Sequence, residues 1–305
     1  MLDRIPDTLC VCLCTYRRAD QLARLLRRLA QQENGGRFIL SIVVVDNDPL
    51  HSARDVLQQF AAQTPIPFRY LHEPVANIAR ARNLAVQEAQ ATWLAFLDDD
   101  EMPPTDWLLQ LLMCVQRTDA DGALGPVLPE FDSPPPRWLQ KARFCERHNP
   151  PADAELRSTR LLRTGNVLIR AQYAQDRSPA FDERLGITGG EDVEFFAHQL
   201  RQGRRFVWCR TAAVLEHVPW QRMTRQYWIR RALLRGVANA HHASILSADT
   251  ARSVAALIIY TSLLPMVALW PHHLFMQLLI RHCDHLGKVL ARMGWRIQSS
   301  RPAPG

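Results

Sequence analysis

The chain has 305 residues, of which 47% are hydrophobic and 22% charged, a composition that excludes disordered and fibrous proteins. Its net charge of +7 is uneven, because fifteen of the 37 Lys and Arg residues but three of the 30 Asp and Glu residues lie from Arg201 onward. This basic part adjoins apolar sequence and carries no aromatic nucleic-acid motif, so we expect it to meet an anionic lipid surface or a diphosphate, and no nucleic acid.

The first predicted strand is the apolar run from Leu9 to Leu13. Cys10, Cys12 and Cys14 alternate along it, so they share one face and suit small buried side chains in a reducing compartment. The seven cysteines are odd in number and lack paired C-x-x-C spacing, which argues against disulfides and a zinc site. The first eight residues are short and polar, unlike a signal peptide, so we expect the folded part in the cytoplasm.

Helices and apolar strands then alternate as far as Leu97. The predicted helices carry Leu22 to Leu29, Ala53 to Gln63 and Ile78 to Glu88, and the predicted strands are Phe38 to Val45, Phe68 to Leu71 and Thr92 to Leu97. This order predicts an α/β fold with a Rossmann-like, mostly parallel central sheet flanked by helices on both faces.

Polar clusters follow three of these strands. They are Thr15 to Arg18, Asp46 to Asp48 and Asp98 to Glu101. Because ligands of such sheets bind beyond the carboxyl ends of the strands, we expect the three clusters to converge on one crevice.

The second half of the chain is less regular. We expect strands at Leu161 to Arg170, Phe206 to Trp208 and Ala213 to Leu215, and helices at Glu191 to Gln202 and Gln226 to Ala240. The pattern favours one main domain, residues 1–240, followed by a helical apolar extension, residues 241–305.

A stretch without formal charge, Ser253 to Ile280, lies in this extension. It is long enough to span a bilayer, but Pro265 and Pro271 are expected to break it in the middle. Basic residues flank both ends, which favours a re-entrant or surface-lying helical hairpin with both ends on the cytoplasmic side. A single span, or a soluble helical pair packed on the domain or on a second subunit, remains open.

Three adjacent carboxylates, Asp98, Asp99 and Asp100, end the strand at Leu97. Like charges raise one another's pKa unless a cation or hydrogen-bond donors balance them, and hard oxygen ligands suit Mg²⁺ or Mn²⁺. On an extended segment, Asp98 and Asp100 share a face and Asp99 does not. A solvated acidic turn that caps a helix is the alternative.

Three further groups carry possible chemistry. Gly189 to Glu194 sets carboxylates at a helix start, where they either cap the helix or supply a general base. His217 follows a strand and is either structural or a metal ligand. Arg222 and Arg225 begin a basic series that suits a solvated helix face or a diphosphate.

Taken together, these motifs resemble family 2 glycosyltransferases, inverting enzymes with the GT-A fold, in particular cytoplasmic members that build bacterial surface polysaccharides. The matching stretches run from about Leu9 to about Gly236 and read VCLCTYRR, IVVVDNDP, NIARARNLAV, WLAFLDDDEMP, TGNVLIR, ITGGEDVEFFAHQLRQG and VLEHVP. DDD alone is weakly specific, whereas DDD some ninety residues before GGED, with CTYRR and VVDN upstream, is strongly specific.

The resemblance implies roles for individual residues. Asp192 is the implied catalytic base with Glu191 supporting it, and Asp100 and His217 are the implied ligands of a divalent metal, Mn²⁺ or Mg²⁺. The implied nucleotide-sugar-binding residues are Thr15, Tyr16, Arg17, Asp46, Arg82, Asp98, Asp99, Arg222 and Arg225.

The resemblance also implies a reaction. One sugar passes with inversion from a nucleotide-sugar, by default a UDP-sugar, to a glycan or lipid-linked acceptor at the inner face of the cell membrane. The chain departs from the family pattern at Asn77, where the usual residue is glycine and where asparagine can keep a positive φ. It also lacks the Q-x-x-R-W motif of processive synthases, which favours single transfer. A nucleotidyltransferase on the same fold and a non-catalytic sugar- or nucleotide-binding scaffold are the alternatives.

Overall fold

The computed structural model describes residues 6–187, 189–238, 240 and 247–294. The chain forms two compact units, the first from Met1–Leu128 and Arg147–His217, the second from Pro129–Glu146 and Val218–Gly305. Strands β7 (Val127–Phe131) and β10 (Val214–Val218) carry the chain from one unit to the other. The division into residues 1–240 and 241–305 stays a prediction.

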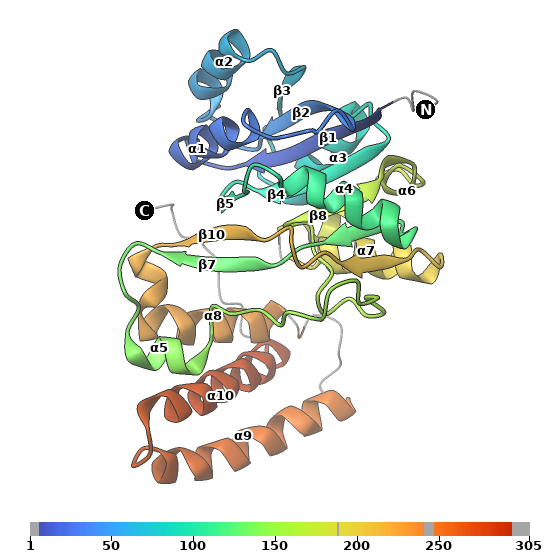
Figure 1. The fold of residues 1–305 in the computed structure, drawn as a ribbon. Coiled ribbons are helices and arrows are strands. Elements are labelled where there is room, and N and C mark those ends of the chain that lie inside the picture. The colour runs from blue at the N-terminus through green and yellow to red at the C-terminus, as the bar shows by residue number, and fades with distance from the viewer. Residues whose placement is uncertain (1–5, 188, 239, 241–246, 295–305) are drawn as a thin grey trace. The chain divides into compact units, whose positions relative to one another are not determined.

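The first unit is built on a central sheet which, among the described residues, has seven strands in the order β3-β2-β1-β4-β8-β6-β9 (Figure 1). Their bounds are β1 Asp7–Thr15, β2 Phe38–Asp46, β3 Phe68–His72, β4 Trp93–Asp98, β6 Gly122–Leu124, β8 Val167–Arg170 and β9 Phe206–Trp208. The first four strands of this order are parallel, and β8 runs antiparallel to both of its neighbours. The predicted α/β fold with a mostly parallel sheet is therefore confirmed.

Helices cover both faces of this sheet. Helices α1 (Ala19–Leu29), α2 (Arg54–Gln63) and α4 (Trp107–Thr118) share one buried cluster with Leu9, Val11 and Leu13 of β1. Helices α3 (Ile78–Glu88), α6 (Ala171–Ala174) and α7 (Glu191–Arg201) share the other with Cys10 and Cys12. Alternation along β1 thus gives each face its own core, and the cysteines share one face as predicted.

The strand register brings the polar clusters to one edge. Thr15 at the end of β1 pairs with Asp46 at the end of β2, and Cys14 pairs with Asp98 at the end of β4. The three clusters therefore meet beyond the carboxyl ends of adjacent parallel strands.

The strand predicted from Leu161 to Arg170 is wrong in its first half, because β8 begins at Val167. Asn166 has a φ of 53°, and its side-chain amide donates to the carbonyl oxygens of Pro126 and Ala212, each at 2.8 Å. A Cβ at Gly165 would lie 2.7 Å from Oε1 of Glu101. These close contacts hold the segment in a loop instead of a strand.

The second unit is helical. It contains α5 (Arg137–Ala142), the 3₁₀ helix η2 (Trp220–Met223), α8 (Arg225–Ala238), α9 (Ala248–Val267) and α10 (His272–Arg292). Its core includes Leu139, Trp228 and Ile280. The helix predicted at Gln226 to Ala240 is confirmed through Ala238, and residue 239 lies outside the described residues.

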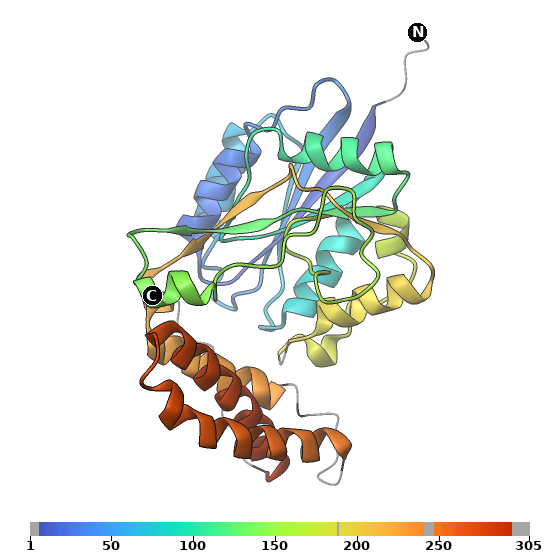
Figure 2. The same cartoon turned by 60° about the horizontal axis from the view of Figure 1, so that its bottom comes forward.

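The apolar stretch forms the predicted pair of helices, α9 and α10, which pack side by side (Figure 2). The stretch is broken in the middle as predicted, since α9 ends at Val267 and α10 begins at His272. Pro271 directly precedes α10, whereas Pro265 lies within the last turn of α9 and does not itself end the helix. Of the described helices, α9 is the one with the length and apolar composition needed to cross a membrane.

Candidate active site

The acid cluster lies where β4 ends. Asp99 accepts hydrogen bonds from Thr15 Oγ1 at 2.9 Å and from Arg18 Nη1 at 2.7 Å, and the same guanidinium nitrogen donates to Asp100 at 3.1 Å. Asp99 and Asp100 therefore share one cation. The prediction that Asp98 and Asp100 share a face is wrong, because the chain turns after Asp98 and the alternation of an extended segment no longer holds.

Three carboxylates in this cluster have raised pKa values. Burial raises the pKa of Asp98 to about 6, and Asp100 and Asp99 add to the shift while Arg82 opposes it. The Asp98 side chain is 50% exposed, so contact with water limits how far burial can raise its pKa. Burial also raises the pKa of Asp99, against Arg18, and raises the pKa of Glu101 well above its usual value.

Arg82 joins this cluster to the start of α7. Its guanidinium forms an ion pair with Glu191 and lies 3.7 Å from Asp98. The Arg82 and Glu191 side chains are 10% and 8% exposed, so their pair is buried. Burial lowers the pKa of Arg82, but the charges of Asp98 and Glu191 outweigh it and raise the pKa overall. The two acidic motifs of the sequence therefore meet through one arginine.

Asp192 is the second residue of α7 and directly follows Glu191 of this pair. Gly189 and Gly190 precede the helix with φ values of +88° and +102°, a backbone conformation that favours glycine. Asp192 accepts a hydrogen bond from the backbone N–H of Val193 at 2.8 Å and is half-buried, whereas Glu191 is buried. Asp192 is therefore the more accessible of the two acids.

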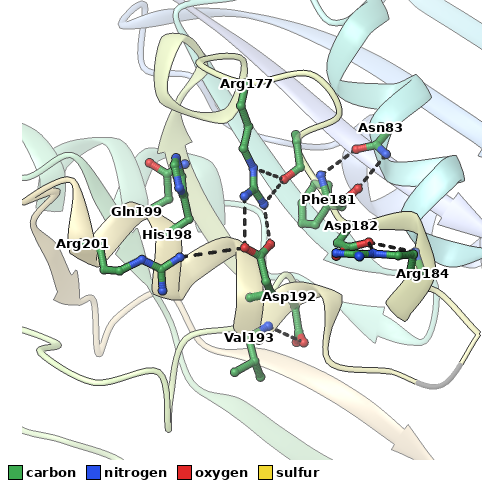
Figure 3. A network of polar contacts seen from close by, with 12 residues as sticks. Asn83, Arg177, Phe181, Asp182, Arg184, Asp192, Val193, His198, Gln199 and Arg201 are labelled. Carbon is green, nitrogen blue, oxygen red and sulfur yellow. Dashed lines mark hydrogen bonds and ion pairs between the residues drawn. The ribbon is translucent and has the colours of Figure 1, made fainter. Parts of the chain in front are cut away.

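A second network holds the first turn of α7 in place (Figure 3). Arg177 donates to Glu194 Oε1 at 3.0 Å and through Nε to the carbonyl oxygen of Ala180 at 2.9 Å. Arg177 holds the pKa of Glu194 below its usual value, against burial. On α3, Asn83 exchanges two hydrogen bonds with the backbone of Phe181, at 2.8 and 2.9 Å. These contacts tie α3 and α7 to the same loop.

The turn after β1 presents Tyr16 and Arg17. Arg17 has a φ of 55°, donates to Asp48 at 3.2 Å and lies 5.1 Å from the Tyr16 ring. Asp46 is fully buried and accepts hydrogen bonds from the backbone N–H groups of Asp48 at 3.1 Å and Ala53 at 2.9 Å. In this structure Asp46 shapes the loop that follows β2.

β10 runs alongside the acid cluster. It pairs antiparallel with β5 (Glu101–Met102), and the backbone N–H of His217 donates to the carbonyl oxygen of Asp100 at 3.1 Å. The two predicted metal ligands are therefore backbone neighbours. In the described part of the chain, no three His, Cys, Asp or Glu side chains form a ready cluster for a metal. The metal therefore stays a prediction, which the oxygen donors of Asp100 suit because Mg²⁺ and Mn²⁺ prefer carboxylate oxygens.

Sequence reasoning included Arg18 and Glu101 in the polar clusters without giving either a role, and it missed Arg147. Arg18 holds Asp99 and Asp100, Glu101 accepts a hydrogen bond from the backbone N–H of Asp98 at 3.2 Å, and Arg147 donates to Glu216 at 2.7 Å. The signal for Arg18 was its place beside Arg17, since three carboxylates at a strand end call for a counter-charge nearby.

The prediction for Asn77 is wrong, and the prediction for Arg222 and Arg225 stays open to test. Asn77 does not take a positive φ but has a φ of −145°, and its side chain caps α3 by accepting from the N–H groups of Ala79 and Arg80. Arg222 and Arg225 belong to the second unit, so their contact with a diphosphate stays a prediction.

Comparison with known proteins gives a consistent result. The model of glycosyl transferase family 2 matches residues 10–177. The succinoglycan biosynthesis protein ExoM of Rhizobium meliloti is 35% identical over 224 residues, which cover 73% of this chain and 71% of that protein. ExoO of the same organism is 25% identical over 229 residues, covering 71% and 62%.

Solved structures share the fold. TarS 1–349 of S. aureus in complex with UDP aligns with a TM-score of 0.55 and 14% identity, over 94% of this chain and 92% of that one. The same protein in complex with UDP-GlcNAc aligns with a TM-score of 0.55 and 13% identity over the same shares. The match to the family model and the identity to ExoM together show that the chain belongs to glycosyltransferase family 2.

Proposed function

We propose that this chain is an inverting glycosyltransferase that moves one sugar from a nucleotide-sugar, with a UDP-sugar favoured, to a hydroxyl of a glycan or lipid-linked acceptor. The observation that carries the proposal is Arg82, which pairs with Asp98 and Glu191 and so keeps the helix that bears Asp192 beside the acid cluster. The names of the relatives ExoM and ExoO refer to succinoglycan biosynthesis, which supports polysaccharide biosynthesis as the setting.

In the proposed reaction Asp192 removes the proton from the acceptor hydroxyl. The hydroxyl oxygen attacks the anomeric carbon from the face opposite the diphosphate, so the configuration inverts. Glu191 does not act on the substrate but orients the start of α7 through Arg82. Thr15, by its hydrogen bond to Asp99, fixes the acid cluster.

The donor is proposed to lie over the edge where β1, β2 and β4 end. Tyr16 and Arg17 lie under the nucleotide, Asp46 keeps the base-side loop in shape, and Arg82 and Asp98 face the ribose and diphosphate. Asp100 and His217 would hold Mn²⁺ or Mg²⁺, which when bound neutralises charge on the leaving diphosphate. Arg222 and Arg225 are proposed to contact the same diphosphate.

The proposed location is the inner face of the cell membrane. Fifteen of the 37 basic residues lie from Arg201 onward, next to the apolar helix α9, which fits a lipid-linked acceptor at an anionic surface.

The test is release of nucleoside diphosphate from a panel of nucleotide-sugars, with Mn²⁺, Mg²⁺ or EDTA. We expect metal-dependent release from one donor, and a turnover lower by about 10²- to 10⁴-fold in Asp192→Asn, the range for a lost general base. The comparison variant is Glu194→Gln in the same helical turn, which breaks the Arg177 pair that holds this turn but keeps the Asp192 carboxylate. Equal losses in both variants would mean that α7, and not the Asp192 carboxylate, is what matters.

The same assay separates the two alternatives. Release of pyrophosphate would identify a nucleotidyltransferase. Donor binding by calorimetry with no turnover, unchanged in Asp192→Asn, would identify a scaffold.

A further inference from the structure

Helix α9 exposes an apolar surface. We define its outer face by the large hydrophobic side chains that are exposed on α9 and in the turn after it, namely Val254, Ile258, Ile259, Leu263, Met266, Leu269 and Trp270. Ile258 is 64% exposed, Trp270 64% and Leu269 91%. Contiguous apolar surface of this kind marks a site of contact with another molecule or a membrane.

The exposed side of α9 is apolar, unlike that of a helix at the surface of a water-soluble protein. Its buried residues are Thr250 and Ser253, whereas Ile258, Ile259 and Met266 point outward. A surface helix in water buries its apolar side chains and exposes its polar ones. The surroundings of the outer face are therefore expected to be less polar than water.

The same unit carries exposed cations on three of its helices. Arg252 lies on α9, Arg281 on α10, and Arg230, Arg231 and Arg235 on α8, all exposed. An apolar helix flanked by arginines complements a bilayer with anionic headgroups, since each basic residue near such a surface adds to binding. A protein partner would have to offer both a large apolar patch and a matching acidic rim.

The packing of the second unit decides how α9 meets a bilayer. α10 packs against both α9 and α8, and in Figures 1 and 2 it lies between them. α8 and α10 are in backbone contact, since a Cβ at Gly236 would lie 2.1 Å from the Asp284 carbonyl oxygen. If α9 crossed the bilayer, α10 would enter with Asp284 and Lys288, and charged side chains in hydrocarbon are costly.

We propose that α9 is an interfacial helix that lies parallel to the surface of an anionic bilayer. Ile258, Ile259 and Met266 face the acyl chains, Trp270 lies at the level of the headgroups, and the arginines of α8 and α10 stay on the aqueous side. At about 1.5 Å per residue, the helix offers about 30 Å of contact along the surface. This inference builds on the proposed membrane-side location, but it is tested without any sugar donor, so its failure and the failure of the proposed chemistry are distinguishable.

The test is sedimentation of the full chain with vesicles of phosphatidylglycerol and phosphatidylcholine, against vesicles of phosphatidylcholine alone. We expect binding to the anionic vesicles to be at least tenfold tighter, and to be weakened by 0.5 M salt, where the Debye length is about 4 Å. The double variant Ile258→Glu, Ile259→Glu should bind at least tenfold more weakly than the wild type. The matched control is Ile39→Glu, which changes an isoleucine 55% exposed on β2 and should bind like the wild type.

Three results would overturn the proposal. Equal binding of the wild type to both kinds of vesicle would remove the anionic surface as the partner. Retention of the chain in the membrane pellet after an alkaline carbonate wash would show that α9 spans. No vesicle binding, with a dimer in light scattering that Ile258→Glu, Ile259→Glu dissociates, would show that a second copy covers the outer face. The wild-type measurements decide the matter even if the double variant fails to fold.

Discussion

Replacing Arg82 by methionine removes the cation that two acidic motifs share while keeping most of the volume of the side chain. Glu191 then loses its partner in a place where 8% of its side chain is exposed. Removing one member of a buried ion pair costs about 3–5 kcal/mol, because the remaining charge stays buried without compensation. The lost pair with Asp98 adds less than about 1 kcal/mol, since that carboxylate is half exposed and 3.7 Å away.

Helix α3 supplies a matched control. Arg80 is 41% exposed and pairs with Glu73 at 3.3 Å, so Arg80→Met should cost less than about 1 kcal/mol. The double variant Arg82→Met, Glu191→Gln removes the orphaned charge and should recover at least half of the loss. Urea unfolding of the full chain, followed by circular dichroism, gives these differences from the shift in midpoint at constant slope. Equal losses for Arg82→Met and Arg80→Met, or no recovery in the double variant, would refute the reasoning.

Three further predictions follow from the contacts of single residues. Asn77→Ala removes the cap of α3 and should lower the free energy of unfolding by about 1 kcal/mol in the urea assay; an unchanged midpoint would contradict the cap. Gly287→Ala sets a Cβ 2.2 Å from the Leu233 carbonyl oxygen and should cost about 1–3 kcal/mol, so a neutral result would argue against the close approach of α8 and α10. The pKa of Asp98 is raised from 3.8 to about 6, so the folded chain holds this proton more tightly than the unfolded chain, and the charged form costs stability above about pH 6. The Tm of Asp98→Asn should therefore exceed that of the wild type at pH 8, with the difference shrinking toward pH 4; a difference that grows on acidification would reverse the sign.

Local sequence patterns predicted several helices and strands well. The helix at Ile78–Glu88 and the strand at Phe206–Trp208 have the predicted bounds, because each is a run of one periodicity between clear breaks in the sequence. The strand prediction was wrong for the residues before Val167 because contacts with distant parts of the chain hold them in a loop. Asn166 bonds to Pro126 and Ala212, partners that no window around residue 166 contains.

The sequence predicted which strand ends form the candidate site, but it did not predict most of the contacts between their side chains. Parallel pairing brings Thr15, Asp46 and Asp98 to one edge, which follows from the order of the elements. The turn at Asp99 and its shared arginine depend on backbone geometry that composition does not encode. The pair of Arg82 and Glu191 joins residues 109 positions apart, so the folded chain was needed to find it.

The second unit is assembled from two separate pieces of the chain, and this limits how the protein can be shortened. Residues 129–146 belong to it, although the rest of the unit begins at Val218. Leu139, together with Trp138 and Phe144, packs in the same cluster as Trp228 and Ile280. A chain cut after residue 217 would keep residues 129–146 but lose the rest of the second unit. Trp138, Leu139 and Phe144 would then be exposed to water without their packing partners. A soluble catalytic fragment would therefore need a redesigned loop at 129–146 as well as a new C-terminus.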